Sequence, residues 1–286
     1  MSTVRIFGEG EAQHYCNGYS GRMGSATQSL DDLLSNYRSR PIHRLIENKA
    51  EFEDYRDCSL RDVERRLFLC VSNLRRSHDL MHTSAAPWAL VTLYYASFFA
   101  ASALLGIFGC HVGGTFIVDV SKSSPGSQEL LISSQAMKTL GISRKGSHER
   151  FWHIFYECSP SLDAFVTNSS LKTALHPVQQ NKTWQIQARN RINYDPYRSF
   201  DLMLGFQTTF NSSHFPSCLQ GELPTQLWVA VNMSKLAFDF ANRMKLSTDA
   251  LNNLAVPGTR GDKIDHLVLQ SSLPSVSRTV DWKKFL

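Results

Sequence analysis

Between Thr83 and Val118 the sequence contains no Asp, Glu, Lys or Arg, and the first two thirds of this segment have the pattern of one helix. Such a run must be shielded from water, either by a lipid bilayer or by a protein core. Residues 87–105 are long enough to span a bilayer, since a membrane helix needs about 20 apolar residues. The same segment also offers a face of small residues that lets another helix approach closely, formed by Ala96, Ala100 and Ala103.

Two tyrosines, Tyr94 and Tyr95, lie at the centre of this segment. Membrane helices place their aromatic anchors near the two interfaces instead. No second apolar span accompanies the segment. We therefore expect the buried central helix of a helical domain, and no membrane partner, with a membrane segment over residues 85–108 as the alternative.

Composition limits the class of protein without fixing its function. The chain has 286 residues, of which 42% are hydrophobic and 19% are charged, as in an ordinary globular protein of one large domain or two small ones. The net charge of +5 permits a nucleic-acid partner but does not require one. The first residues lack the apolar region of a secretory signal, so a cytoplasmic location is expected.

The six cysteines predict neither a metal site nor a disulfide framework. None of them forms a Cys-x-x-Cys pair, and the gaps between them are too wide for a zinc ribbon. Scattered cysteines in a chain of this size are typical of reduced core residues in a cytosolic protein. No sequence feature indicates a cofactor, and we expect none.

Local patterns divide the chain into four parts. Residues 1–27 lack periodicity and are expected to form a loose arm, and residues 28–57 to form two accessory helices, the second over about 42–56. A new helix is expected to begin at Ser59, an N-cap candidate, and to open a helical domain over 58–245. Residues 246–286 are expected to form a C-terminal helix and tail.

The expected fold class is all-α, with one small β-hairpin inserted at about 110–135. The hairpin comes from two β-branched or apolar runs, at 115–120 and 129–133, which flank a turn-rich segment. The remaining segments are expected to be helical, over about 147–157, 160–176, 181–193, 198–209 and 224–245, where Pro224 suits a first helical turn.

The densest group of polar side chains lies between residues 188 and 197. Arg189 and Tyr194 are five positions apart, with two asparagines between them. Arginine is suited to bind phosphate because its planar guanidinium donates to two oxygens at once. A solvated helix end with a capping network is the alternative interpretation of the same residues.

Three segments in this order resemble one known family. Tyr94–Leu105 resembles the signature second helix of HEPN domains, small all-α domains of prokaryotic toxins and defence proteins. Ser147–Phe151 resembles the short basic segment with a histidine that those domains carry next. Arg189–Tyr194, followed by Asp195–Pro196, resembles the branch in which Arg-x-x-x-x-Tyr replaces Arg-x-x-x-x-His. The resemblance covers about residues 58–245.

The resemblance implies a homodimer in which two motif helices meet and form a shared cleft. Active HEPN domains are ribonucleases that work without metal, using the RNA 2′-hydroxyl to attack the adjacent phosphate. Carried over by position, Arg189 binds the phosphate, and Tyr194 stands where the histidine would be. The expected catalytic residues are therefore Arg189, Asn193 and Tyr194, and the expected RNA-binding residues are Asn190, Arg191, His148, Arg75 and Arg76.

Two functions remain open because tyrosine replaces histidine. A phenol titrates near pH 10 and is a poor general base at neutral pH, whereas imidazole titrates near 6.5. The first function is RNA cleavage in a prokaryotic defence or toxin system, with a companion antitoxin or effector protein as a possible partner. The second is a catalytically inactive HEPN-like module that binds nucleic acid or a partner protein for assembly or regulation.

Overall fold

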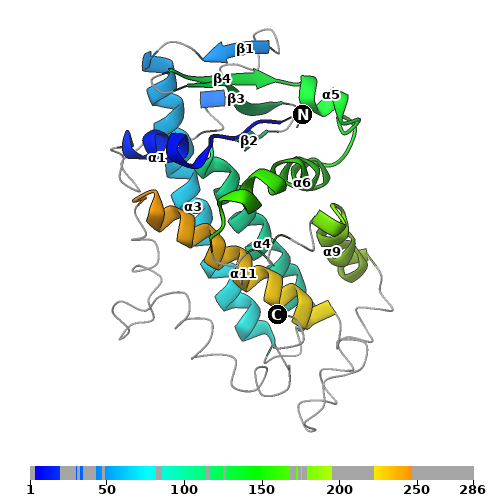
Figure 1. Ribbon diagram of the computed structural model, residues 1–286. Helices are drawn as coiled ribbons and strands as arrows, with labels where there is room; N and C mark the ends of the chain where they lie inside the picture. Colours follow the sequence, from blue (N-terminus) through cyan, green and yellow to red (C-terminus); the bar gives the residue numbers. More distant parts are fainter. Residues whose placement is uncertain are drawn as a thin grey trace, which may run out of the picture.

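The computed structural model describes residues 4–19, 43–46, 49–81, 86–113, 116–124, 127–167, 179–194 and 222–246, with five isolated positions between these ranges. This part of the chain is mostly helical and carries one small antiparallel sheet. Figure 1 shows the sheet at one end of three long helices, with shorter helices beside them. The expected predominance of helix is confirmed.

Helix α4 (Ala86–Ile107) is the central helix and packs between α3 (Lys49–Met81) and α11 (Glu222–Arg243). The close approach relies on small residues. A Cβ placed on Gly106 would lie only 2.5 Å from Cγ2 of Val63 on α3. The predicted small-residue face is confirmed by three alanines that are completely buried, Ala96, Ala100 and Ala103.

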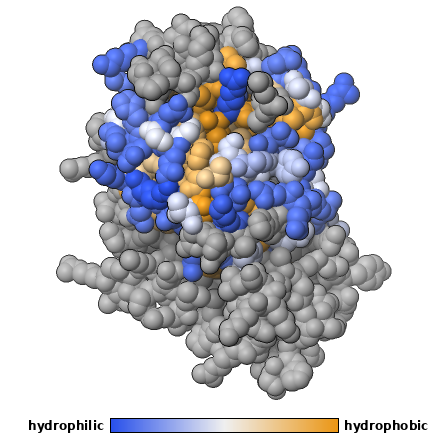
Figure 2. All heavy atoms as spheres, in the orientation of Figure 1, coloured by the Kyte–Doolittle hydropathy of each residue, from blue (hydrophilic) through white to orange (hydrophobic). Residues whose placement is uncertain are grey.

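The long apolar helix is enclosed by the rest of the protein. Residues 87–107 have the length and composition of a membrane span, yet 78% of the most apolar window is buried inside the fold. A core helix of a soluble protein has these same properties. Figure 2 shows that hydrophilic residues surround a central strip of apolar ones on the face viewed there. The cytoplasmic location stays a prediction.

The sheet has four strands in the order β1-β4-β3-β2, all antiparallel. The predicted hairpin is confirmed as β3 (Ile117–Ser124) and β4 (Ser127–Ser133), although both strands run further into the polar turn than expected. Two short strands complete the sheet, β1 (His43–Ile46) and β2 (His111–Val112). The helix expected over 42–56 is therefore wrong in its first part, because residues 43–46 pair with β4.

The loose arm expected at the N-terminus is wrong for residues 4–19. These residues contain α1 (Glu9–Asn17), and their apolar side chains join the core, namely Val4, Phe7, Ala12, Tyr15 and Cys16. The backbone N–H of Val120 donates to the carbonyl of Arg5 over 3.2 Å, which fastens the segment to β3. The burial comes from long-range contacts, which cannot be predicted from the sequence of a short helix with little periodicity.

The boundary expected between residues 57 and 58 is also wrong. Helix α3 runs without interruption through this point, and Ser59, the expected N-cap, is buried in its interior. The sequence from 49 to 81 contains no glycine or proline, so nothing in it breaks the helix. Residues 49–57 of the expected accessory segment therefore belong to the same helix as the first residues of the expected helical domain.

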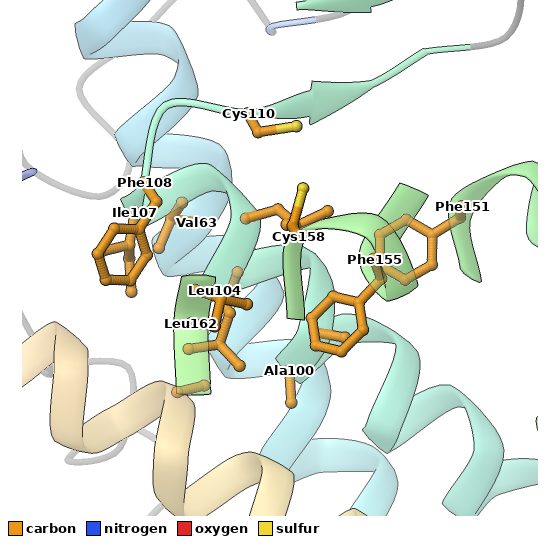
Figure 3. Close-up of a cluster of buried hydrophobic side chains, with 14 of the residues drawn as sticks. Val63, Ala100, Leu104, Ile107, Phe108, Cys110, Phe151, Phe155, Cys158 and Leu162 are labelled. Atoms are coloured by element: carbon orange, nitrogen blue, oxygen red, sulfur yellow. The ribbon is translucent and has the colours of Figure 1, made fainter. Parts of the chain in front are cut away.

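Helix α6 (Ser147–Phe165) joins the helix expected over 147–157 to the first part of the one expected over 160–176, and it contains Pro160 without ending there. Most of residues 168–176 lie outside the described residues. A short helix, α5 (Gln135–Thr139), precedes it. In Figure 3 side chains of α3, α4 and α6 meet in one apolar cluster that includes Val63, Leu104 and Phe155. The last predicted helix is confirmed as α11, whereas the helix expected over 198–209 and residues 247–286 lie outside the described residues.

Candidate functional site

Arg189 is on helix α9 (Trp184–Tyr194), which packs on α4 and α6. Its guanidinium carbon lies 5.6 Å from the ring centroid of Tyr94 and 5.8 Å from that of Tyr95. Both distances are within the range of a cation–π interaction. The half-buried guanidinium is therefore held in place by aromatic rings of α4.

Within the described residues the guanidinium of Arg189 makes only one hydrogen bond. Nη1 makes one long contact of 3.5 Å with Oδ1 of Asn190. Nε is enclosed and has no hydrogen-bond partner among the described residues. Within the described ranges no carboxylate forms an ion pair with this guanidinium. A guanidinium that is fixed in position but has unused donors is suited to bind an oxyanion.

His148 lies in the first turn of α6 and packs on the same pair of tyrosines. Its ring centroid is 5.6 Å from that of Tyr94, 5.8 Å from that of Tyr95 and 4.6 Å from that of Phe98. Burial lowers the pKa of His148, and the charge of Arg189 lowers it further. The imidazole is therefore neutral at neutral pH.

The hydroxyl of Tyr94 joins α4 to α6. It lies 2.8 Å from Nδ1 of His148, and Nε1 of Trp152 donates to it over 3.1 Å. Burial raises the pKa of Tyr94 above its usual value, an effect that Trp152 and Arg189 only partly offset. The phenol is thus a neutral hydrogen-bonding group, and it organises the site without exchanging its proton at neutral pH.

Tyr194 is on another side of α9, with 73% of its surface exposed. A separation of five positions rotates a side chain by about 140° around a helix and moves it about 7.5 Å along the axis. Asn193, four positions after Arg189, shares the face of the arginine instead. The catalytic role expected for Tyr194 stays a prediction.

Two other expected RNA-binding residues, Arg75 and Arg76, lie on a different helix from Arg189. Arg75 and Arg76 are exposed on α3, whereas α9 packs on α4 and α6. The side chain of Arg191 lies outside the described residues. Among the residues that the structure describes, no three His, Cys, Asp or Glu side chains come close enough to hold a metal ion.

Sequence reasoning did not assign site roles to Tyr94, Tyr95 or Trp152. One signal was present, because His148 and Trp152 are four positions apart and so lie on the same face of α6. That face meets Tyr94 only after α4 and α6 pack together. We therefore define the Arg189 site as Arg189, Asn190, His148, Tyr94, Tyr95 and Trp152. No protein-family model, curated protein or solved structure matches this chain.

Proposed function

We propose that this protein is a HEPN-like RNA-binding protein and a metal-independent endoribonuclease of a prokaryotic defence or toxin system. The observation that supports the proposal most strongly is the guanidinium of Arg189, which packs on two tyrosine rings that also hold His148. Its one hydrogen bond within the described part of the chain is to Asn190. This group of residues offers one fixed positive charge and several N–H donors to a phosphodiester.

The proposed reaction needs only the RNA strand itself. The 2′-oxygen forms a bond to the adjacent phosphorus, and the bond from phosphorus to the 5′-oxygen breaks. The products are a 2′,3′-cyclic phosphate and a free 5′-hydroxyl, while the proton of the 2′-hydroxyl leaves and another reaches the 5′-oxygen. Arg189 stabilises the negative charge that builds on the non-bridging oxygens, a kind of contribution that preorganised donors make efficiently.

The second candidate function is an inactive module that binds nucleic acid or a partner protein. One observation favours it: Tyr194, which stands at the position of the proton-transfer residue, is largely exposed and lies away from the face of Arg189. A homodimer that brings two α9 helices together would favour the enzyme instead. The dimer and a companion antitoxin or effector protein are parts of this proposal.

Cleavage of RNA in EDTA tests the proposal. We expect purified protein to cut single-stranded RNA and to leave cyclic phosphate ends. Arg189→Ala should reduce the rate about 100-fold or more, because it removes a donor to the developing charge. Arg189→Lys keeps the positive charge but loses the planar guanidinium that donates to two oxygens at once, so it should keep only part of the wild-type rate.

The matched control is Lys138→Ala, which removes one positive charge from an exposed position on α5 outside the Arg189 site. It should keep the wild-type rate. RNA binding that depends on Arg189 but yields no product would support the inactive module. If neither binding nor cleavage responds to Arg189→Ala, the Arg189 site has no role in RNA recognition, and both the ribonuclease and the nucleic-acid-binding module lose their basis.

A further inference from the structure

We infer that Tyr94 and His148 complete a phosphate subsite at Arg189, in which Tyr94 fixes the tautomer of His148 and His148 donates its Nε2–H to a phosphate oxygen. This inference rests on the proposed function in using Arg189 as the anion-binding residue. It adds a neutral donor and a positioning residue, and neither of these depends on whether the bound RNA is cut.

The tautomer follows from the hydrogen bonds around one oxygen. The indole N–H of Trp152 is only a donor, so the Tyr94 oxygen accepts that bond. The phenol hydrogen then needs an acceptor, because an unpaired buried donor is costly. Nδ1 of His148, at 2.8 Å, is the acceptor available among the described residues. With Nδ1 accepting, the proton of the neutral imidazole is on Nε2.

The neutral state of His148 agrees with this arrangement. Protonation would place a hydrogen on both ring nitrogens and would force the phenol of Tyr94 to give up its donation to Nδ1. Glu149 follows His148 in the chain and would favour an imidazolium, but its carboxylate is paired with the ammonium of Lys145. The cation that affects the histidine is Arg189, which disfavours a second positive charge.

Nε2 of His148 has no hydrogen-bond partner in the part of the chain that the structure describes, so a ligand can accept from it. The one hydrogen bond of this half-buried side chain within the described residues uses Nδ1. His148 and Arg189 pack on the same two tyrosine rings, and the charge of Arg189 acts on the imidazole, so the two side chains are neighbours. The proposed anion lies between them and accepts from one donor of each. A single positive charge with an added neutral donor matches the single negative charge of a phosphodiester.

Nitrogen-15 NMR of histidine-labelled protein tests the tautomer directly. The His148 signal, assigned by its loss in His148→Ala, should show a protonated Nε2 and an unprotonated Nδ1 at pH 7. Inorganic phosphate should shift the Nε2 signal in the wild type and should not shift it in Arg189→Ala. In Tyr94→Phe the fixed tautomer should give way to a mixture of both.

Binding of a fully 2′-O-methylated oligouridine, which cannot be cleaved through its 2′-oxygen, tests the subsite. We expect Tyr94→Phe and His148→Ala each to weaken binding about tenfold, as for the loss of one hydrogen bond to a charged group. The matched control is Tyr156→Phe, which also removes a phenol hydroxyl but lies two turns further along α6. It should bind within about twofold of the wild type.

The two proposals fail in different ways. A protonated Nδ1 in the wild type, or equal binding by Tyr94→Phe and Tyr156→Phe, overturns the subsite even if RNA is cleaved and Arg189→Ala is inactive. The expected NMR and binding results without any cleavage in EDTA support the subsite and remove the ribonuclease. The tautomer itself is measured in the wild type, so a folding defect in a variant does not decide that result.

Discussion

The phenol oxygen of Tyr94 on α4 lies 2.8 Å from Nδ1 of His148 on α6, although the two residues are 54 positions apart in the chain. The same oxygen accepts the indole N–H of Trp152. One buried hydroxyl therefore joins the central helix to the first two turns of α6 and orients the histidine next to Arg189. Stability and ligand binding should both depend on it.

We expect Tyr94→Phe to destabilise the protein by about 1 to 3 kcal/mol. The buried N–H of Trp152 would lose its acceptor, and an unpaired buried donor costs about this much. Tyr95→Phe removes a hydroxyl that has no hydrogen-bond partner among the described residues, so it should change stability by less than about 0.5 kcal/mol. Urea unfolding of the two variants measures the difference, and equal midpoints would contradict the network.

Gly109 should tolerate no side chain. It follows α4 with a φ of +78°, and a Cβ there would overlap the ring of Phe7. We expect Gly109→Ala to cost about 2 kcal/mol or more, from backbone strain and from displacement of the ring. Gly141 has a similar φ of +67° but open space around it, so Gly141→Ala should cost only about 1 kcal/mol. Thermal unfolding of both variants measures the two losses of stability. The excess loss in Gly109→Ala is the cost of displacing the Phe7 ring.

Asp119 should make stability depend on pH. Burial in β3 raises the pKa of this carboxyl to about 6, and the backbone N–H of Arg5 offsets the effect only in part. The folded state therefore binds the proton more tightly than the unfolded state does. The tighter binding of this proton adds to the free energy of unfolding. The addition is complete below pH 4, because the carboxyl is then protonated in both states, and it is lost as the pH rises through about 6.

An uncharged amide at position 119 avoids this loss. Asp119→Asn should be more stable than the wild type at pH 7, by up to about 3 kcal/mol, and should lose its advantage near pH 4. Urea unfolding at several pH values measures the difference. An Asn variant that is equally less stable at both pH values would show that the carboxylate makes favourable contacts when charged.

Helix α4 should behave as a core helix rather than as a membrane span. Because most of it is buried between α3 and α11, we expect the full chain to stay in the supernatant without detergent. Ultracentrifugation of the lysate, followed by carbonate extraction of the pellet, measures this. A chain that resists extraction and needs detergent would support the membrane alternative over residues 85–108.

Mixing two inactive variants tests whether Tyr194 serves the Arg189 site of a second copy. If it does, a mixture of Arg189→Ala and Tyr194→Phe contains heterodimers in which one site keeps both groups, and part of the RNA cleavage should return. Analytical ultracentrifugation shows whether dimers form. A Tyr194→Phe protein that cleaves RNA at the wild-type rate would remove Tyr194 from the mechanism.

The elements that sequence patterns predicted well are those with strong local signals. The β3–β4 hairpin has two apolar runs and a turn, and α11 has a periodic apolar face. Strand β1 was missed because four residues become a strand only by pairing with β4, more than 80 positions later. Helix α1 was missed for the same reason, since its burial comes from distant contacts.

The sequence by itself determined that a long uncharged helix needs shielding from water, and it singled out Arg189 as the residue best suited to a phosphate. The first conclusion follows from the chemistry of neighbouring residues, whereas the choice of Arg189 comes from the resemblance to HEPN domains. Only the tertiary structure decided that Arg189 stands on Tyr94 and Tyr95, that His148 shares these rings, and that Tyr194 faces away. The reason is physical: helix periodicity fixes which residues share a face, but the packing of α4, α6 and α9 fixes which faces meet.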